Sequence, residues 1–76
     1  MPTLARFDGI QIVMNTRDHL PAHVHVLFKE DEVVVEIADG AVYAGSIAGH
    51  ALTSAREWIA ANRESLTARW AEYQRR

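Results

Sequence analysis

Residues 23–29 read His-Val-His-Val-Leu-Phe-Lys, and this stretch decides the fold. Its apolar residues Val24, Val26 and Phe28 occupy every second position, so in an extended strand they lie on one face and both histidines on the other. A short polar turn separates this run from residues 32–37, which alternate in the same way. Two alternating runs joined by so few residues predict an antiparallel hairpin.

Alternating sequence continues on both sides of this hairpin. Residues 9–15 carry Ile10, Ile12 and Met14 at period two, which predicts an earlier strand with one buried face. After the hairpin, the tight turn Ala38-Asp39-Gly40 leads into residues 42–47, which we expect to return as a short fourth strand. The sequence therefore predicts three to four antiparallel strands.

The periodicity changes to about 3.6 residues after Gly49, which indicates helix over the C-terminal third. The apolar stripe is made by Leu52, Ala55, Trp58, Ile59, Leu66, Trp70 and Tyr73. Asn62 interrupts it and is a favoured N-cap residue, so we expect two helices or one kinked helix. The predicted fold is α+β: the antiparallel sheet, followed by these helices packed on one of its faces, in a single domain over residues 1–76.

The sheet face opposite the predicted core has a mixed composition. It is too apolar for a fully solvated surface and too polar for a second core, which is typical of an interaction site. Its predicted residues are Gln11, Val13, Asn15, His23, His25, Leu27, Val34 and Glu36.

Composition excludes several protein classes. The chain has 76 residues, 49% of them hydrophobic and 24% charged, with no cysteine and a net charge of -2. It therefore has no disulfides and no thiolate zinc site, and we expect a cytoplasmic protein. Met1 to Phe7 has no apolar stretch typical of a signal peptide, and no run is long enough to span a membrane.

The charge is distributed unevenly along the chain. Residues 1–49 carry seven acidic against three basic side chains, and residues 50–76 carry five arginines against three glutamates. The arginines could contact phosphate, but the interleaved glutamates are typical of a solvated helix surface. Nucleic-acid binding is therefore only weakly supported.

Asp18, His19, His23 and His25 form the chemically distinctive cluster of the sequence. The His-x-His pair puts two imidazoles on one side of a strand, roughly 6.5 to 7 Å apart along the chain. Two such rings can chelate one metal ion, with His19 or Asp18 folding back as a third ligand. His19, His23 and His25 are therefore the candidate metal ligands, and no other cofactor is predicted.

Two further interpretations of the cluster remain open. His23 or His25 could act as a general acid or base, with Asp18 or Glu36 fixing its tautomer, as in metal-free RNA cleavage. Asp18, His19, His23 and His25 are then the catalytic candidates. Alternatively, the cluster orders the connection between two strands and has no chemical role.

The chain resembles a family of very small bacterial proteins that is known only as a domain of unknown function. The resemblance rests on the Met1-Pro2-Thr3-Leu4 start, the string Asp18-His19-x-Pro21-x-His23-x-His25-Val26, and the helices from Trp58 to Trp70. It implies a second small protein encoded nearby, in an arrangement similar to toxin-antitoxin gene pairs. It implies no catalytic residues.

Together these observations predict a protein-binding component of a toxin-antitoxin-like two-protein system, using the outer face around His23, His25 and Glu36. Homodimerisation through that face or through the helices is a further expectation. The alternative is a small ribonuclease or metal-dependent hydrolase centred on the histidine cluster. The sequence leaves open whether the protein is an enzyme.

Overall fold

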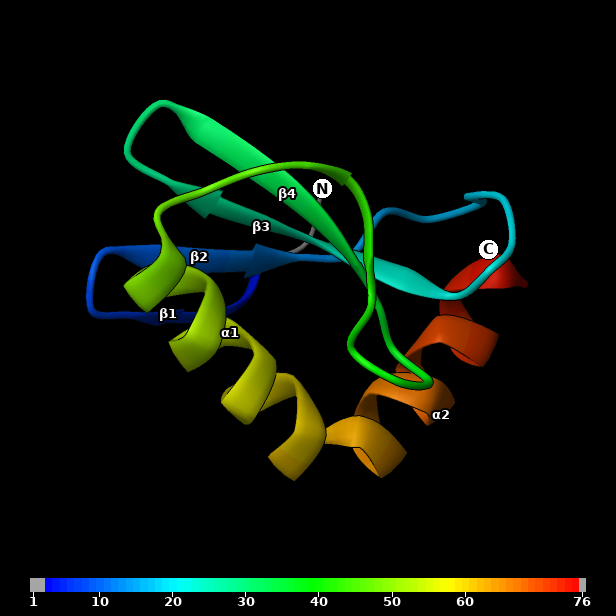
Figure 1. Ribbon diagram of the computed structural model, residues 1–76. Helices are drawn as coiled ribbons and strands as arrows, with labels where there is room; N and C mark the ends of the chain where they lie inside the picture. Colours follow the sequence, from blue (N-terminus) through cyan, green and yellow to red (C-terminus); the bar gives the residue numbers. More distant parts are fainter. Residues whose placement is uncertain (1–2, 76) are drawn as a thin grey trace.

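The computed structural model describes residues 3–75. Met1 and Pro2, which belong to the family-like start of the sequence, and Arg76, the last of the five C-terminal arginines, lie outside the described residues. Five strands form one antiparallel sheet in which each strand lies beside the next in the chain (Figure 1). They are β1 (Thr3–Phe7), β2 (Ile10–Val13), β3 (His23–Phe28), β4 (Asp31–Glu36) and β5 (Val42–Gly45). Two helices, α1 (Gly49–Ala61) and α2 (Arg63–Gln74), complete the α+β fold.

The predicted count of three to four strands is wrong, because β1 adds a fifth. It pairs with β2 through a turn at Asp8 and Gly9, which both have positive φ angles of 50° and 77°. This backbone conformation is the one that favours Asp-Gly at two-residue hairpin turns. None of the five residues of β1 is fully buried, and its register shifts between Thr3 and Ala5, so alternation does not identify the strand.

The central hairpin is confirmed, with Val26 of β3 opposite Val33 of β4. The Asp39-Gly40 turn that follows is also present: Asp39 Oδ1 accepts the Ala41 N–H at 3.0 Å, and Gly40 has a φ of 74°. β5 forms the edge of the sheet but ends at Gly45, two residues earlier than predicted.

The helical region divides at Asn62, as expected, and Asn62 occupies the N-cap position of α2 without a side-chain capping hydrogen bond. Its side chain makes no capping hydrogen bond to α2 and instead donates from Nδ2 to the Trp58 carbonyl of α1 at 2.8 Å. The helices form a V on one side of the sheet (Figure 1). Their buried side chains are Ala51, Ala55, Ile59, Leu66, Trp70 and Tyr73.

The core lies between the helices and the predicted inner face of the sheet. All nine predicted inner residues are at most 8% exposed: Ile10, Ile12, Met14, Val24, Val26, Phe28, Val33, Val35 and Ile37. The residues that recur every two positions in the strands and those that recur about every 3.6 positions in the helices therefore pack against each other in one core.

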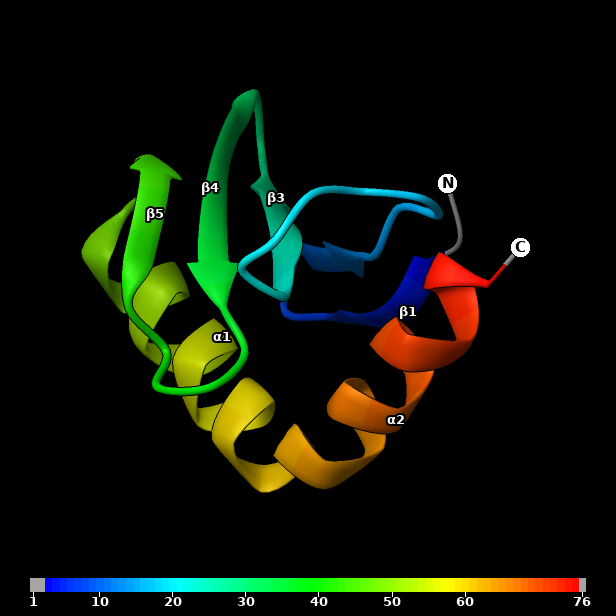
Figure 2. The same ribbon diagram turned by 90° about the vertical axis from the view of Figure 1, so that its right-hand side faces the viewer.

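The opposite face of the sheet is less exposed than its sequence predicts. Val13 is fully buried and His23 is only 2% exposed. His23 begins β3 at the end of the sheet, where its ring lies 5.1 Å from that of Trp70 in α2. Figure 2 shows how the connection of residues 14–22 (cyan) passes close to this end of β3. Tertiary contacts, which strand periodicity does not encode, bury a histidine that alternation places outside.

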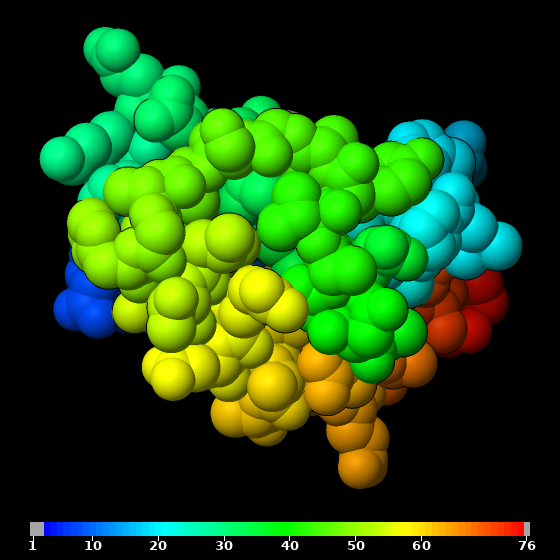
Figure 3. Space-filling model, in the orientation of Figure 1, coloured from blue at the N-terminus to red at the C-terminus, as the bar shows by residue number. Residues whose placement is uncertain are grey.

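Segments that are distant in sequence meet beside this connection. The rings of His19 and Tyr43 are 6.1 Å apart. In the space-filling view the residues near 20 and those near 40 form one continuous surface (Figure 3). Within residues 3–75, neither helix is both long enough and apolar enough to cross a membrane.

Candidate functional site

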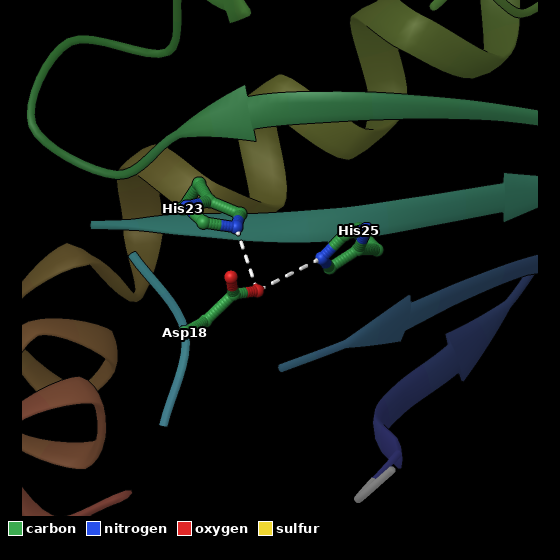
Figure 4. Close-up of side chains that lie close together, drawn as sticks. All are labelled: Asp18, His23 and His25. Carbon is green, nitrogen blue, oxygen red and sulfur yellow. Dashed lines mark hydrogen bonds and ion pairs between the residues drawn. The ribbon is translucent and has the colours of Figure 1, made fainter. Parts of the chain in front are cut away.

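Asp18 lies between His23 and His25 and contacts both. Its Oδ2 atom is 3.0 Å from His23 Nε2 and 3.5 Å from His25 Nε2. The two imidazoles project from β3 and the carboxylate approaches them from the connection before the strand (Figure 4). The structure thus brings together three of the four residues predicted from the sequence.

The other nitrogen of each imidazole has a hydrogen-bond acceptor. His23 Nδ1 is 2.7 Å from the Pro21 carbonyl oxygen, and His25 Nδ1 is 2.6 Å from Glu32 Oε2. Because a carbonyl and a carboxylate only accept, both Nδ1 atoms carry the proton. Nε2 of each ring faces Asp18 Oδ2: it donates a hydrogen bond to the carboxylate when the ring is protonated, and it presents a lone pair when the ring is neutral.

The pKa of Asp18 reflects these contacts. Burial raises this pKa. The hydrogen bonds from the His19 backbone N–H at 2.8 Å and from His25 and His23 lower it, and so does the positive charge of His23 when protonated; together these effects outweigh burial. The net result is a pKa lowered from 3.8 to about 2. Asp18 is therefore an anion at neutral pH, which makes its carboxylate a weak proton acceptor but a suitable ligand for a metal cation.

His19 lies beside this group without belonging to it. Its side chain is 64% exposed, and its Nδ1 lies 3.1 Å from the carbonyl oxygen of Leu20. Its Nε2 is 3.6 Å from Oδ1 of Asp18, whereas His23 and His25 contact Oδ2. Three ligand atoms, from Asp18, His23 and His25, lie within 4.8 Å of one another.

Glu36 is directly opposite His23 in the strand register, yet it does not orient either imidazole. Both nitrogens of His23 are engaged by Asp18 and the Pro21 carbonyl, and the carboxylate on His25 is that of Glu32. Glu32 is a diagonal neighbour of His25, because His25 pairs with Val34 and side chains two positions apart share a face. The hairpin register makes both Glu32 and Glu36 diagonal neighbours of His25, so it narrows the choice to two glutamates without selecting Glu32.

Asn15, which the sequence places on the same outer face as His23 and His25 but not in the cluster, is the second residue that the structure adds to the site. Its Nδ2 is 3.4 Å from Asp18 Oδ2 and 3.2 Å from His25 Nε2. Val13 pairs with His25, so Asn15 comes two residues later on the same face. The position of Asn15 on this face is the sequence feature that points to the site, because asparagine as a residue type does not.

Solvent reaches the cluster from one side. Asn15, Thr16, Arg17 and Asp18 line a shallow depression of about 390 Å³. On the other side, His23 is closed in by the rings of Trp70 and Tyr43, at 5.1 and 6.2 Å. Aromatic rings therefore flank His23, while the connection that carries Asp18 borders an open depression.

The cluster can act chemically in two ways. In the first, Asp18 and the two imidazoles share protons, which serves acid-base chemistry or ties the connection to the strand. In the second, the two Nε2 lone pairs and the carboxylate oxygen bind one divalent cation, with the Pro21 carbonyl and Glu32 holding the rings in place. Hydrogen bonds of this kind from Nδ1 accompany almost all metal-bound histidines.

Comparison with known proteins identifies the family. No curated protein and no solved structure shows a significant similarity to this chain. One family model, described as Domain of unknown function (DUF4160), matches residues 9–71. This range includes the whole Asp18, His23 and His25 cluster and most of the fold. The chain therefore belongs to the DUF4160 family.

Proposed function

We propose that the protein binds a divalent transition-metal ion through Asp18 Oδ2, His23 Nε2 and His25 Nε2. One observation carries this proposal: both imidazoles have their Nδ1 protons on fixed acceptors, so that both Nε2 atoms converge on one carboxylate oxygen.

The spacing of the three atoms supports the proposal. Ligands bound at about 2.1 Å with angles of 90° to 109° lie roughly 3.0 to 3.4 Å from one another. The two distances from Asp18 Oδ2 to the imidazoles, 3.0 and 3.5 Å, fall in or close to this range. The three ligand atoms lie within 4.8 Å of one another, so a cation could enter if the two imidazoles approach each other as it binds.

The donor set indicates which ions are suitable and what they could do. Two imidazole nitrogens and a carboxylate oxygen suit Zn²⁺, Ni²⁺, Fe²⁺ or Mn²⁺. Three protein ligands leave positions for water and substrate, and the open side of the cluster supports access to them. Hydrolysis is the reaction class that such a centre supports.

Thermal unfolding of a tag-free, chelator-treated protein tests the proposal. At one hundred times the Kd, a bound ion stabilises the fold by about 2.7 kcal/mol, which raises the Tm by roughly 10 to 20 °C in a domain of this size. H25Q should abolish the rise. H50Q is the matched control, because His50 lies on α1 with its ring against Phe28. Equal shifts in the wild type and H25Q, or no shift with any of these ions, would overturn the proposal.

Binding of a small protein partner is the second candidate function. It is supported by large apolar side chains exposed near the cluster, with Leu20 at 76% and Tyr43 at 50% exposed. The predicted toxin-antitoxin-like pairing would use this surface. Co-purification with the product of the neighbouring gene tests it, and the double variant L20S/Y43S should lose the partner while remaining folded. Retention of the partner by that variant would exclude this surface.

A further inference from the structure

The side-chain amide of Asn15 combines two unusual features. Its Nδ2 lies beside two groups of the proposed metal site, His25 Nε2 at 3.2 Å and Asp18 Oδ2 at 3.4 Å. Its Oδ1 is buried and has no hydrogen-bond partner among residues 3–75. A buried, unpaired amide oxygen is uncommon and calls for a physical explanation.

Rotation of the amide by half a turn exchanges these two atoms. Without a cation, the orientation seen here is favourable, because the N–H groups of Asn15 point towards a lone pair and a carboxylate. With a cation between Asp18 and His25, the same N–H groups would face a positive charge. The rotated amide would instead direct its oxygen at the cation.

The position of the amide is suitable for a ligand atom. After rotation, Oδ1 would take the place of Nδ2, at 3.2 Å from His25 Nε2 and 3.4 Å from Asp18 Oδ2. Both distances match the spacing of roughly 3.0 to 3.4 Å between neighbouring ligands of one transition-metal ion. Amide oxygens are established ligands for divalent cations.

We infer that Asn15 is a fourth metal ligand, which turns its amide oxygen onto the ion when the ion binds. This inference rests on the proposed metal site and extends it to two nitrogen and two oxygen donors, so that a position for water or substrate remains only on an ion that takes five or six ligands. Such a set favours ions that accept oxygen ligands, such as Zn²⁺, Mn²⁺ or Fe²⁺, over soft ions that prefer sulfur.

Nuclear magnetic resonance of the full chain with Zn²⁺ observes the rotation directly. In the metal-free protein, the Asn15 amide protons should show cross-relaxation with the ring C–H protons that flank His25 Nε2. Saturating Zn²⁺ should remove these signals. Asn62 provides an internal control, since its Nδ2 donates to the Trp58 carbonyl and should not respond. Persistence of the Asn15 signals in the Zn²⁺-bound protein would overturn the inference.

Titration of two variants with Zn²⁺ gives an independent readout. N15L removes the oxygen at similar volume and should weaken binding by about tenfold or more. N15D keeps an oxygen at the position, so it should bind Zn²⁺ at least as tightly as the wild type. Wild-type affinity in N15L would overturn the inference and leave the metal site standing. Absence of Zn²⁺ binding in the wild type would overturn both.

Discussion

Replacing Asp18 with asparagine removes the negative charge between the two imidazoles at almost unchanged volume. The pKa of Asp18 is lowered from 3.8 to about 2 in the folded protein, so its charge stabilises the fold at neutral pH. The difference corresponds to about 2 kcal/mol at pH 7. In a domain of this size, D18N should therefore lower the Tm by roughly 8 to 16 °C.

The effect has a defined pH dependence. Because the folded-state pKa lies below the unfolded one, the contribution is fully present well above pH 3.8 and is lost as the pH falls towards 2. The difference between wild type and D18N should fall to roughly half by pH 3. Urea unfolding followed by tryptophan fluorescence from pH 7 to pH 3 measures it, with the exposed D31N as control. An equal difference in unfolding free energy between wild type and D18N at pH 7 and pH 3 would refute the electrostatic account, because the substitution would then act through packing and not through charge.

Two further changes test the fold. G45A should destabilise the protein by roughly 1 to 3 kcal/mol and loosen β5. Gly45 has a φ of 78°, and an added Cβ would collide with the Glu32 carbonyl oxygen. Urea unfolding measures the loss of stability, and hydrogen exchange measures the loosening of β5. I59A should cost about 2 to 5 kcal/mol in urea unfolding, because it leaves a cavity at a fully buried position between α1 and the sheet.

Each of these changes has a control on the same chain. For G45A it is G49A, since a Cβ at Gly49 meets no atom within 4 Å. For I59A it is A60G, which alters an exposed position of the same helix and should cost only about 1 kcal/mol. Wild-type stability in G45A would contradict the account of the β4 and β5 pairing. A loss in I59A no larger than that in A60G would contradict the account of the core.

The alternation of apolar residues in β2, β3 and β4 is sufficient to predict the inner face of the sheet. It fails for β1, whose residues lie at the edge and bury little. The signal for β1 lies in the turn instead, where Asp8-Gly9 is a strong hairpin sequence. Local turn chemistry thus identifies a strand that hydrophobic periodicity does not.

The candidate site was only partly predictable. The spacing of His23 and His25 places both rings on one side of β3, and Asp18 is close enough along the chain to reach them. The burial of His23 depends on Trp70, which lies 47 residues later and reaches it only through the packing of α2. Glu36 was chosen by face alone. It lies as many positions from Val34, the residue opposite His25, as Glu32 does, so the register does not separate the two glutamates, and the structure shows the His25 hydrogen bond to Glu32.

The central claim is that Asp18, His23 and His25 together hold one metal ion. Calorimetric titration of the tag-free chain with Zn²⁺ tests this most directly, with H25Q and H50Q measured alongside. We predict one ion per chain, binding weakened by at least about 100-fold in H25Q, and unchanged binding in H50Q. A wild-type chain without a saturable site, or an H25Q variant that binds Zn²⁺ as the wild type does, would contradict the claim.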